Sequence, residues 1–166
     1  MTTYLEITKD LEEVFAKFDA LYIEKQIAYY VEKSNSIKEY YDNLPKERNG
    51  AWVRNSYSYD AVCQIAGGKG MYEKLQHSNL NAVTLLATKD AKSVIKARNA
   101  KMAKKLEEAG ITKIIKSNLE LNSDGFHGYY NVETDNGNKT IRIETIIAGG
   151  YNIQRLHYRT LVKISK

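Results

Sequence analysis

The sequence predicts an α+β fold in which a helical N-terminal part is followed by a basic helix packed on a four-stranded antiparallel β-meander. Apolar residues recur every three or four positions in the predicted helices, and from Thr112 onward they alternate with polar ones. Three turn-forming pairs then divide the C-terminal segment at regular intervals: Asp124-Gly125, Asn136-Gly137 and Gly149-Gly150. We expect one domain over 1–166, mainly helical at 1–87 and helix plus sheet at 88–166.

Composition excludes several classes of protein. The chain has 166 residues, of which 43% are apolar and 27% charged, which is typical of a soluble globular protein and too apolar for a disordered one. A single cysteine, Cys63, excludes an internal disulfide framework and a thiolate zinc cluster. No run approaches the roughly 18 apolar residues of a membrane span, and Glu6 and Asp10 interrupt the region of a signal peptide. We therefore expect a cytoplasmic protein.

The first predicted helix runs to Pro45. Thr8 is the expected N-cap, and acidic residues follow it in the first turn, where the helix dipole favours them. One apolar face carries Leu11, Val14, Phe15, Phe18, Leu21 and Tyr22. Residues 45–58, which include the only tryptophan, Trp52, are expected to form a loop.

A short helix is expected from Tyr59 to Ala66, capped by Gly67 and Gly68. Lys69 to Gln76 is a candidate for another. The glycine run lacks the spacing of a phosphate-binding loop and the Ser or Thr after its lysine, so we interpret it as a helix cap and turn.

The clearest predicted helix runs from Lys89 to Ala109, with Thr88 as its cap and Gly110 as its stop. Its apolar stripe is interrupted by Arg98. Seven bases lie between residues 89 and 105 against one acid, Asp90. Residues 1–84 carry a net charge of −2 and residues 85–166 carry +7. This asymmetry indicates that a polyanion would contact the second half, although a basic helix face can also serve solubility alone.

Four strands are expected near 113–122, 126–134, 139–147 and 152–164. The turn pairs set their registers, and the expected apolar partners are Val132 with Ile141, Tyr130 with Ile143, Leu156 with Ile143 and Tyr158 with Ile141. Leu119 and Leu121 join the same face. All three turns give one apolar face, which we expect to pack on the basic helix.

The other sheet face is polar by the same alternation. It carries His127, Tyr129, Asn131, Glu133, Thr140, Arg142, Glu144, Ile146, Arg155, His157, Arg159 and Lys163. The registers place Tyr129, Glu144 and Arg155 in one row across the strands. They place Asn131, Arg142 and His157 in the next. Such a face is a solvated surface with cross-strand ion pairs, a ligand-binding surface or a catalytic site.

As a binding protein, the chain would contact nucleic acid, RNA or DNA, or a nucleic-acid-bound protein complex, through its C-terminal half. The basic helix would contact phosphates, and tyrosines would stack on unpaired bases. The expected contact residues are Lys92, Lys96, Arg98, Lys101, Lys104, Lys105, Tyr129, Arg142, Arg155, His157 and Arg159. His77, His127 and His157 lack the spacing of metal ligands, so neither a metal nor a cofactor is expected.

A metal-independent ribonuclease or phosphodiesterase is the first alternative. Glu144 or Glu133 would then be the base and His157 or His127 the acid, and the arginines at 142, 155 and 159 would hold the phosphate. Helices followed by such a sheet resemble the layout of barnase and RelE-like ribonucleases. The second alternative is a protein-only inhibitor or adaptor, because nine of the thirteen tyrosines lie in the acidic N-terminal half.

The segment from Ile147 to Arg159 reads IAGGYNIQRLHYR and resembles the C-terminal end of small phage or mobile-element proteins of the anti-defence, anti-CRISPR-like kind. The resemblance covers about the last third of the chain and carries no catalytic residues. It implies a phage-encoded inhibitor of a host defence nuclease such as a CRISPR effector, acting in the host cytoplasm.

Overall fold

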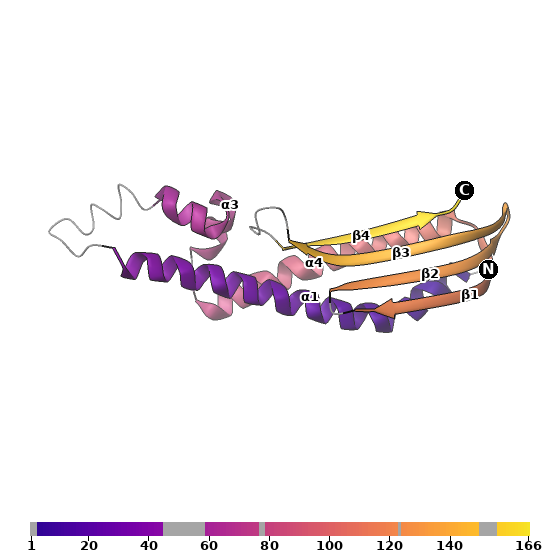
Figure 1. The fold of residues 1–166 in the computed structure, drawn as a ribbon, viewed down its shortest axis with the longest axis horizontal. Coiled ribbons are helices and arrows are strands. Elements are labelled where there is room, and N and C mark those ends of the chain that lie inside the picture. The colour runs from indigo at the N-terminus through magenta and orange to yellow at the C-terminus, as the bar shows by residue number, and fades with distance from the viewer. Residues whose placement is uncertain (1–2, 45–58, 77–78, 123, 150–155) are drawn as a thin grey trace. The chain divides into compact units, whose positions relative to one another are not determined.

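The computed structural model describes residues 3–44, 59–76, 79–122, 124–149 and 156–166. The elements in chain order are α1 (Thr3–Asp42), a helical segment at 59–66, α3 (Lys69–Leu75), α4 (Leu80–Glu108), β1 (Ile111–Leu121), β2 (Gly125–Thr134), β3 (Gly137–Gly149) and β4 (Leu156–Ile164) (Figure 1). The four strands form one sheet in the order β1-β2-β3-β4. The predicted α+β fold with a four-stranded meander is therefore confirmed.

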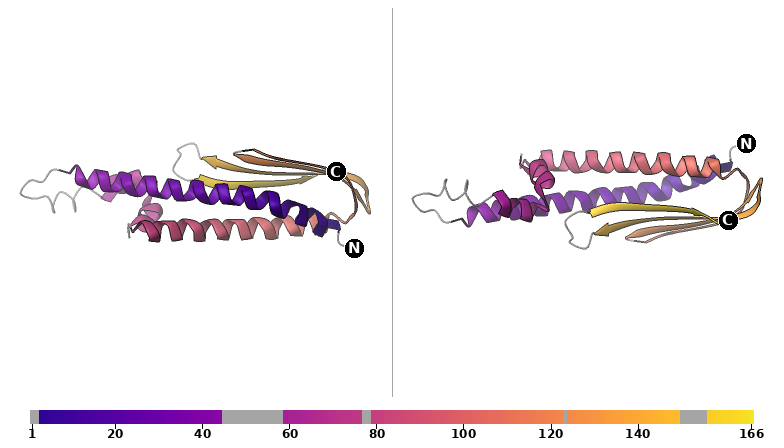
Figure 2. Two further views of the ribbon diagram at one scale, coloured as in Figure 1. Left: turned by 90° about the horizontal axis from the view of Figure 1, so that it is seen from below. Right: turned by 90° about the horizontal axis from the view of Figure 1, so that it is seen from above.

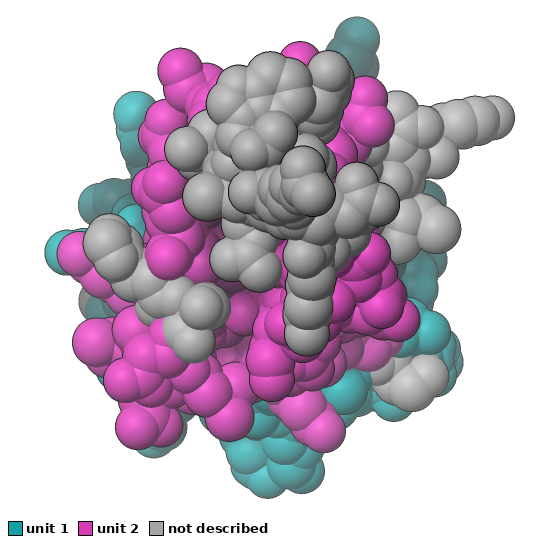
Figure 3. All heavy atoms as spheres, turned by 90° about the vertical axis from the view of Figure 1, so that its left-hand side faces the viewer, with its two compact units in different colours: residues 1–22, 91–148, 157–166 teal, residues 23–90, 149–156 magenta. Residues whose placement is uncertain are grey.

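The chain divides into two compact units, which Figure 3 shows in different colours. Unit 1 comprises residues 1–22, 91–148 and 157–166, and unit 2 comprises 23–90 and 149–156. Each of the long helices α1 and α4 contributes to both units. The units therefore do not coincide with the expected parts 1–87 and 88–166.

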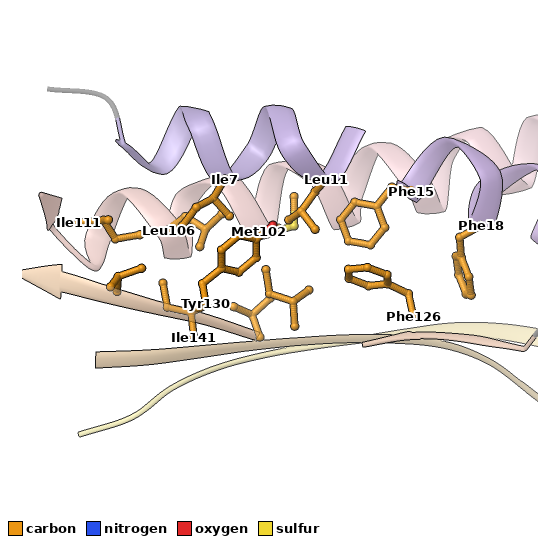
Figure 4. Close-up of a cluster of buried hydrophobic side chains, with 13 residues drawn as sticks. Ile7, Leu11, Phe15, Phe18, Met102, Leu106, Ile111, Phe126, Tyr130 and Ile141 are labelled. Carbon is orange, nitrogen blue, oxygen red and sulfur yellow. The ribbon is translucent and has the colours of Figure 1, made fainter. Parts of the chain in front are cut away.

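Unit 1 has two layers. The unit 1 parts of α1 and α4 lie side by side over one face of the sheet (Figure 2). The core between the layers takes Ile7, Leu11, Phe15 and Phe18 from α1, Met102 and Leu106 from α4, and Phe126, Tyr130, Val132, Ile141 and Ile143 from β2 and β3 (Figure 4). The predicted apolar face of the sheet is thus confirmed, and α1 covers it together with the basic helix.

The packing around Phe126 explains why residue 128 on the same strand is glycine. The Phe126 ring is fully buried and meets Phe15 edge to face, with 4.9 Å between ring centroids. A Cβ on Gly128 would lie 2.9 Å from the Phe126 ring and 3.2 Å from Leu119. Any side chain there would overpack the core.

The register between β2 and β3 differs from the prediction by two residues. Thr134 pairs with Gly137, so the loop residues are Asp135 and Asn136. The Thr134 hydroxyl donates to the Gly137 carbonyl at 2.8 Å and accepts from the Asn136 N–H at 3.2 Å, and Gly137 has a φ of 97°. These bonds stabilise the earlier turn. A slip of two residues leaves every side chain on its predicted face, because successive side chains alternate between faces.

The shift changes individual partners. Tyr130 pairs with Ile141, where the prediction paired it with Ile143. The first hairpin is also displaced, because Asn122 and Gly125 close its turn and Leu121 pairs with Phe126. Leu121, expected in the core, is 39% exposed at the end of the edge strand β1.

The register of β4 on β3 is set by contacts near the end of the chain. Ser165 N–H donates to the Thr140 carbonyl at 2.9 Å, and the hydroxyls of Thr145 and Thr160 are 3.0 Å apart. The predicted pairing of Tyr158 with Ile141 is therefore wrong. The Gly149-Gly150 turn that set it lies partly outside the described residues.

Two predicted helix caps are also wrong. α4 begins at Leu80, where the Asn79 side chain accepts from the Asn81 N–H at 3.0 Å. Thr88, the expected cap, lies inside the helix and donates to the Thr84 carbonyl at 2.8 Å. Thr8 likewise lies inside α1 and donates to the Tyr4 carbonyl at 2.9 Å. Threonine hydroxyls can bond the carbonyl four residues back, so threonine alone is a weak boundary signal.

Unit 2 has a separate helical core. It consists of Tyr29, Tyr30, Ala66, Met71, Leu75, Val83 and Ala87. At its border the Asp90 carboxylate accepts from the Tyr30 hydroxyl at 2.9 Å and from the Lys74 ammonium at 2.6 Å. In the described part of the chain, no helix combines the length and the apolar character needed to cross a bilayer.

The hydroxyl of Tyr130 gives the first testable prediction. Tyr130 is fully buried in the unit 1 core, and its hydroxyl has no hydrogen-bond partner among the described residues. Burial raises the pKa of this phenol, and the charge of Asp10 raises it further, so the group is neutral and stays a buried donor without an acceptor among the described residues. Tyr130→Phe should stabilise the fold by about 1 kcal/mol, because it removes the desolvation penalty of the hydroxyl. Thermal unfolding should show a melting temperature about 2–4 °C higher. A lower melting temperature would contradict this account.

Candidate functional site

A polar cluster lies on the outer face, which is the side of the sheet away from α1 and α4. His127 stands opposite Glu144 and Tyr129 opposite Arg142 on the neighbouring strands β2 and β3. The His127 Nδ1 atom is 3.2 Å from Glu144 Oε1, and the Arg142 guanidinium forms an ion pair with the same oxygen. The guanidinium carbon of Arg142 lies 5.7 Å from the centroid of the Tyr129 ring. Strand pairing alone therefore assembles this four-residue cluster.

Glu144 and Arg142 are both charged at neutral pH. Partial burial tends to raise the pKa of the Glu144 carboxyl, but the hydrogen bonds and charges of Arg142 and His127 outweigh it, and the net shift is downward. The hydrogen bond to Glu144 raises the pKa of Arg142. Glu144 is thus an ionised carboxylate with two donors on one oxygen.

The two predicted rows across the sheet are wrong, because they depended on the predicted registers. Glu144 stands beside His127 instead of Tyr129, and Arg142 stands beside Tyr129 instead of Asn131. Arg155 lies outside the described residues.

His157 is separated from the cluster. It precedes Thr160 by three residues, and Thr160 contacts Thr145, the neighbour of Glu144 in sequence. At about 3.3 Å per residue, His157 is displaced about 10 Å along the strand from that contact.

This arrangement is poorly suited to the catalytic alternative. General acid–base cleavage of a phosphodiester needs an acid and a base that reach different oxygens of the substrate. Glu144 and His127 bond each other at 3.2 Å, and the second candidate acid, His157, is displaced from them. Glu133, the other candidate base, pairs with Asn138 and Lys113 on the adjacent strands. The geometry is that of a surface ion-pair network beside an exposed ring.

The rest of the outer face is polar and mostly exposed. Within the described residues it carries Lys113, Lys116, Asn118 and Glu120 on β1, Asn131 and Glu133 on β2, Asn138, Thr140 and Ile146 on β3, and His157, Arg159, Leu161 and Lys163 on β4. Together with the cluster, the described part of this face carries five lysines and arginines and three glutamates. Tyr129 is 39% exposed on an inner strand of the sheet.

Arg98, which was predicted to contact nucleic acid at the surface, is a core residue. Its side chain is 3% exposed and forms a two-point ion pair with Asp19, at 2.6 and 3.1 Å. Its guanidinium carbon lies 4.1 Å from the centroid of the Phe15 ring, and it also bonds the Tyr158 hydroxyl, which donates to Asp19 at 2.6 Å. Arg98 therefore joins α1, α4 and β4 through this ion pair. Its place in the apolar stripe of the basic helix was the sequence signal of burial.

The other predicted bases of α4 are accessible. Lys92, Lys96, Lys101 and Lys104 are exposed, and Lys105 is half-buried. The charge asymmetry of the two sequence halves is nevertheless absent from the compact units. Unit 1 has fifteen lysines and arginines against twelve acids, and unit 2 has ten against eight, because the acidic start of α1 belongs to the same unit as the basic C-terminal segment.

The tyrosines of the N-terminal half mostly serve the fold. Tyr22, Tyr29 and Tyr30 are buried, and of the nine only Tyr59 is exposed among those that the structure describes. Tyr41 and Tyr72 line a cavity of about 180 Å³ in unit 2. Trp52 lies outside the described residues. These positions reduce the support for the tyrosine-based protein-only alternative.

In the residues with a described position, no three His, Cys, Asp or Glu side chains form a group that could hold a metal ion. His77 lies outside them. Compared with protein-family models, with curated proteins and with solved structures, the chain matches none. The resemblance of its C-terminal third to phage proteins stays a prediction.

Proposed function

We propose that the outer face of the sheet in unit 1 binds single-stranded nucleic acid, RNA or DNA. The observation that carries the proposal is the exposed pair of Tyr129 and Arg142 on the inner strands. Unpaired bases stack on aromatic rings and on guanidinium planes, and each stacked base contributes about 1–3 kcal/mol. The strands keep both groups at a fixed spacing, so little side-chain entropy is lost on binding.

The surroundings of the pair support phosphate contacts. Glu144 holds the Arg142 guanidinium through one of its terminal nitrogens, which leaves further N–H groups able to donate. Lys116 lies on β1 opposite Asn131, and Arg159 and Lys163 lie on β4, so cations flank the pair on both sides. Asn118 and Asn131 add amides that can bond base edges.

The test is fluorescence anisotropy of labelled oligo(U) and oligo(dT) over a salt series, with EDTA present. Tyr129→Ala should weaken binding by about 1–3 kcal/mol, about 5- to 150-fold, because it removes the stacking surface. Tyr129→Phe should retain most of the affinity. Tyr59→Ala removes another exposed tyrosine, from unit 2, and should change nothing.

Two results would refute the proposal: wild-type protein that binds neither oligonucleotide at low salt, or a Tyr129→Ala variant as tight as wild type. The same samples on a denaturing gel test the ribonuclease alternative, for which cut RNA that survives intact with Glu144→Gln would be the evidence. Inhibition of a host defence nuclease by a phage protein stays a prediction of the resemblance alone.

A further inference from the structure

A groove runs between α4 and β4 in unit 1. It consists of two adjoining cavities of about 70 and about 390 Å³, which share Lys105 and Val162 in their walls. The smaller one is also lined by Lys101 and Thr160. The larger one extends to the turn between β2 and β3, where Asn136 and Lys139 line it.

The groove is positively charged. Lys101, Lys105 and Lys139 contribute three ammonium groups, whereas the charge of Arg98 in its wall is offset by Asp19. The acid among the lining residues is Glu108, which lies 3.8 Å from the Lys104 ammonium and is thereby partly compensated. The field in the groove therefore favours an anion.

The side chain of Lys105 is fixed in place at the wall of the groove. Its side chain is half-buried, and its ammonium donates to the backbone carbonyl of Val162 at 3.2 Å. An ammonium has three N–H donors, so this bond leaves two for a ligand. Because the stem is already fixed, binding loses less side-chain entropy than it would at a free surface lysine.

The edge of β4 that faces away from β3 adds backbone donors. β4 is the last strand in the sheet order, and the Ser165 N–H bonds β3. Since alternate residues of an antiparallel strand direct their backbone groups to opposite edges, those of Thr160 and Val162 point away from β3. The bond from Lys105 to the Val162 carbonyl agrees with this direction. Backbone N–H groups beside ammonium groups are typical of phosphate recognition.

We propose that this groove binds the phosphate backbone of a nucleic-acid strand that continues from the outer face around the edge of β4. The proposal rests on the proposed function of that face. Arg159 and Lys163 lie on the outer side of β4, and Lys105 lies on its other side, so cations continue around the edge. Tyr129 is on β2, two strands from β4, a distance of about 10 Å across the sheet. A short oligonucleotide can therefore occupy the face alone, and a longer one reaches the groove.

The experiment compares labelled oligo(U) of 5 and 15 nucleotides by anisotropy over a salt series. The groove variant is Lys105→Gln with Lys139→Gln. Lys9→Gln with Lys17→Gln on α1 is a charge-matched control from the same unit. The groove variant should bind the 15-mer about tenfold more weakly or worse at 0.1 M salt. Its salt slope should fall by about 1.4, because each contact to a single strand contributes about 0.7. The 5-mer affinity and the control variant should match wild type.

Lys139→Gln alone separates binding from folding, because Lys105→Gln also removes the bond to Val162. It should show about half of the change in salt slope with an unchanged melting temperature. Undiminished 15-mer binding by the groove variant would overturn the inference. So would a loss that is equal for both lengths or for the α1 control, because the lysines would then act only through net charge. If the proposed function of the outer face is wrong, the results differ from these. The wild-type protein would then bind neither oligonucleotide, or Tyr129→Ala would bind the 5-mer as tightly as wild type.

Discussion

Asp19→Ala is expected to destabilise the protein by about 3–5 kcal/mol, a large part of the stability of an ordinary domain. The reason is that Asp19 neutralises Arg98, whose side chain is 3% exposed. Without the carboxylate, a guanidinium charge would remain buried against Phe15 without compensation, and the Tyr158 hydroxyl would lose its acceptor. Urea unfolding followed by circular dichroism measures the loss. The control is Glu13→Ala, since Glu13 is 84% exposed in its pair with Lys17 and should change stability by less than about 0.5 kcal/mol.

A combined variant distinguishes charge burial from general damage at this position. Burial raises the pKa of Asp19 and lowers that of Arg98, and in each case the partner's charge opposes the shift without outweighing it. Keeping both groups ionised in the folded state therefore lowers the free energy of unfolding. Asp19→Leu, Arg98→Met and Tyr158→Phe together should restore stability close to that of wild type, because apolar groups of similar volume replace the whole network. If the triple variant is no more stable than Asp19→Ala, the unpaired buried charge of Arg98 is not the cause of the lost stability.

Phe126→Ala should cost about 3–5 kcal/mol, because the ring is fully buried and its removal leaves a cavity that the sheet and helices cannot fill. The cavity would lie between β2 and α1, where the ring meets Phe15 at 4.9 Å. Chemical denaturation measures the change. Ile115→Ala is the control on the same sheet, since Ile115 is 53% exposed beside a register shift of β1 and should change stability by less than about 0.5 kcal/mol.

Phe126→Leu provides a graded comparison, because it keeps most of the volume and should lose less than the alanine variant. Equal losses for leucine and alanine would show that the edge-to-face ring contact, and not the filled volume, stabilises this part of the core. Phe126 also precedes His127, so its packing fixes the strand that presents the polar cluster.

The faces of the sheet were predictable from the sequence, but the contacts across it were not. Alternation along a strand assigns each side chain to a face, so Tyr130 and Ile141 were placed in the core and Tyr129 and Arg142 outside it. Partner identity depends on which residue closes each turn. At the second hairpin, the hydrogen bond from the Thr134 hydroxyl to the Gly137 carbonyl stabilises a turn two residues out of the predicted register. Glu144 consequently pairs with His127 instead of Tyr129.

Helix boundaries and the burial of charge depended on tertiary contacts. Asn79 caps α4 nine residues before the expected cap, because the apolar positions of its first turns pack in unit 2. Arg98 was counted with the surface bases since its partner, Asp19, lies 79 residues earlier in the sequence. The groove beside β4 could not be foreseen, because it joins residues of one helix, one turn and one strand.

The division of the chain also determines when the protein can fold during synthesis. Unit 1 begins with residues 1–22 but needs 91–148 and 157–166 to complete its core, and residues 23–90 of the other unit are translated in between. The bond between Asp19 and Tyr158 spans 139 residues. Such high contact order slows folding, since a long loop must close before its contacts stabilise it. On the ribosome, Phe15 therefore cannot contact Phe126, and Phe18 cannot contact Tyr158, until those strands have emerged, and this interval is when the nascent protein is most exposed to aggregation and to chaperones.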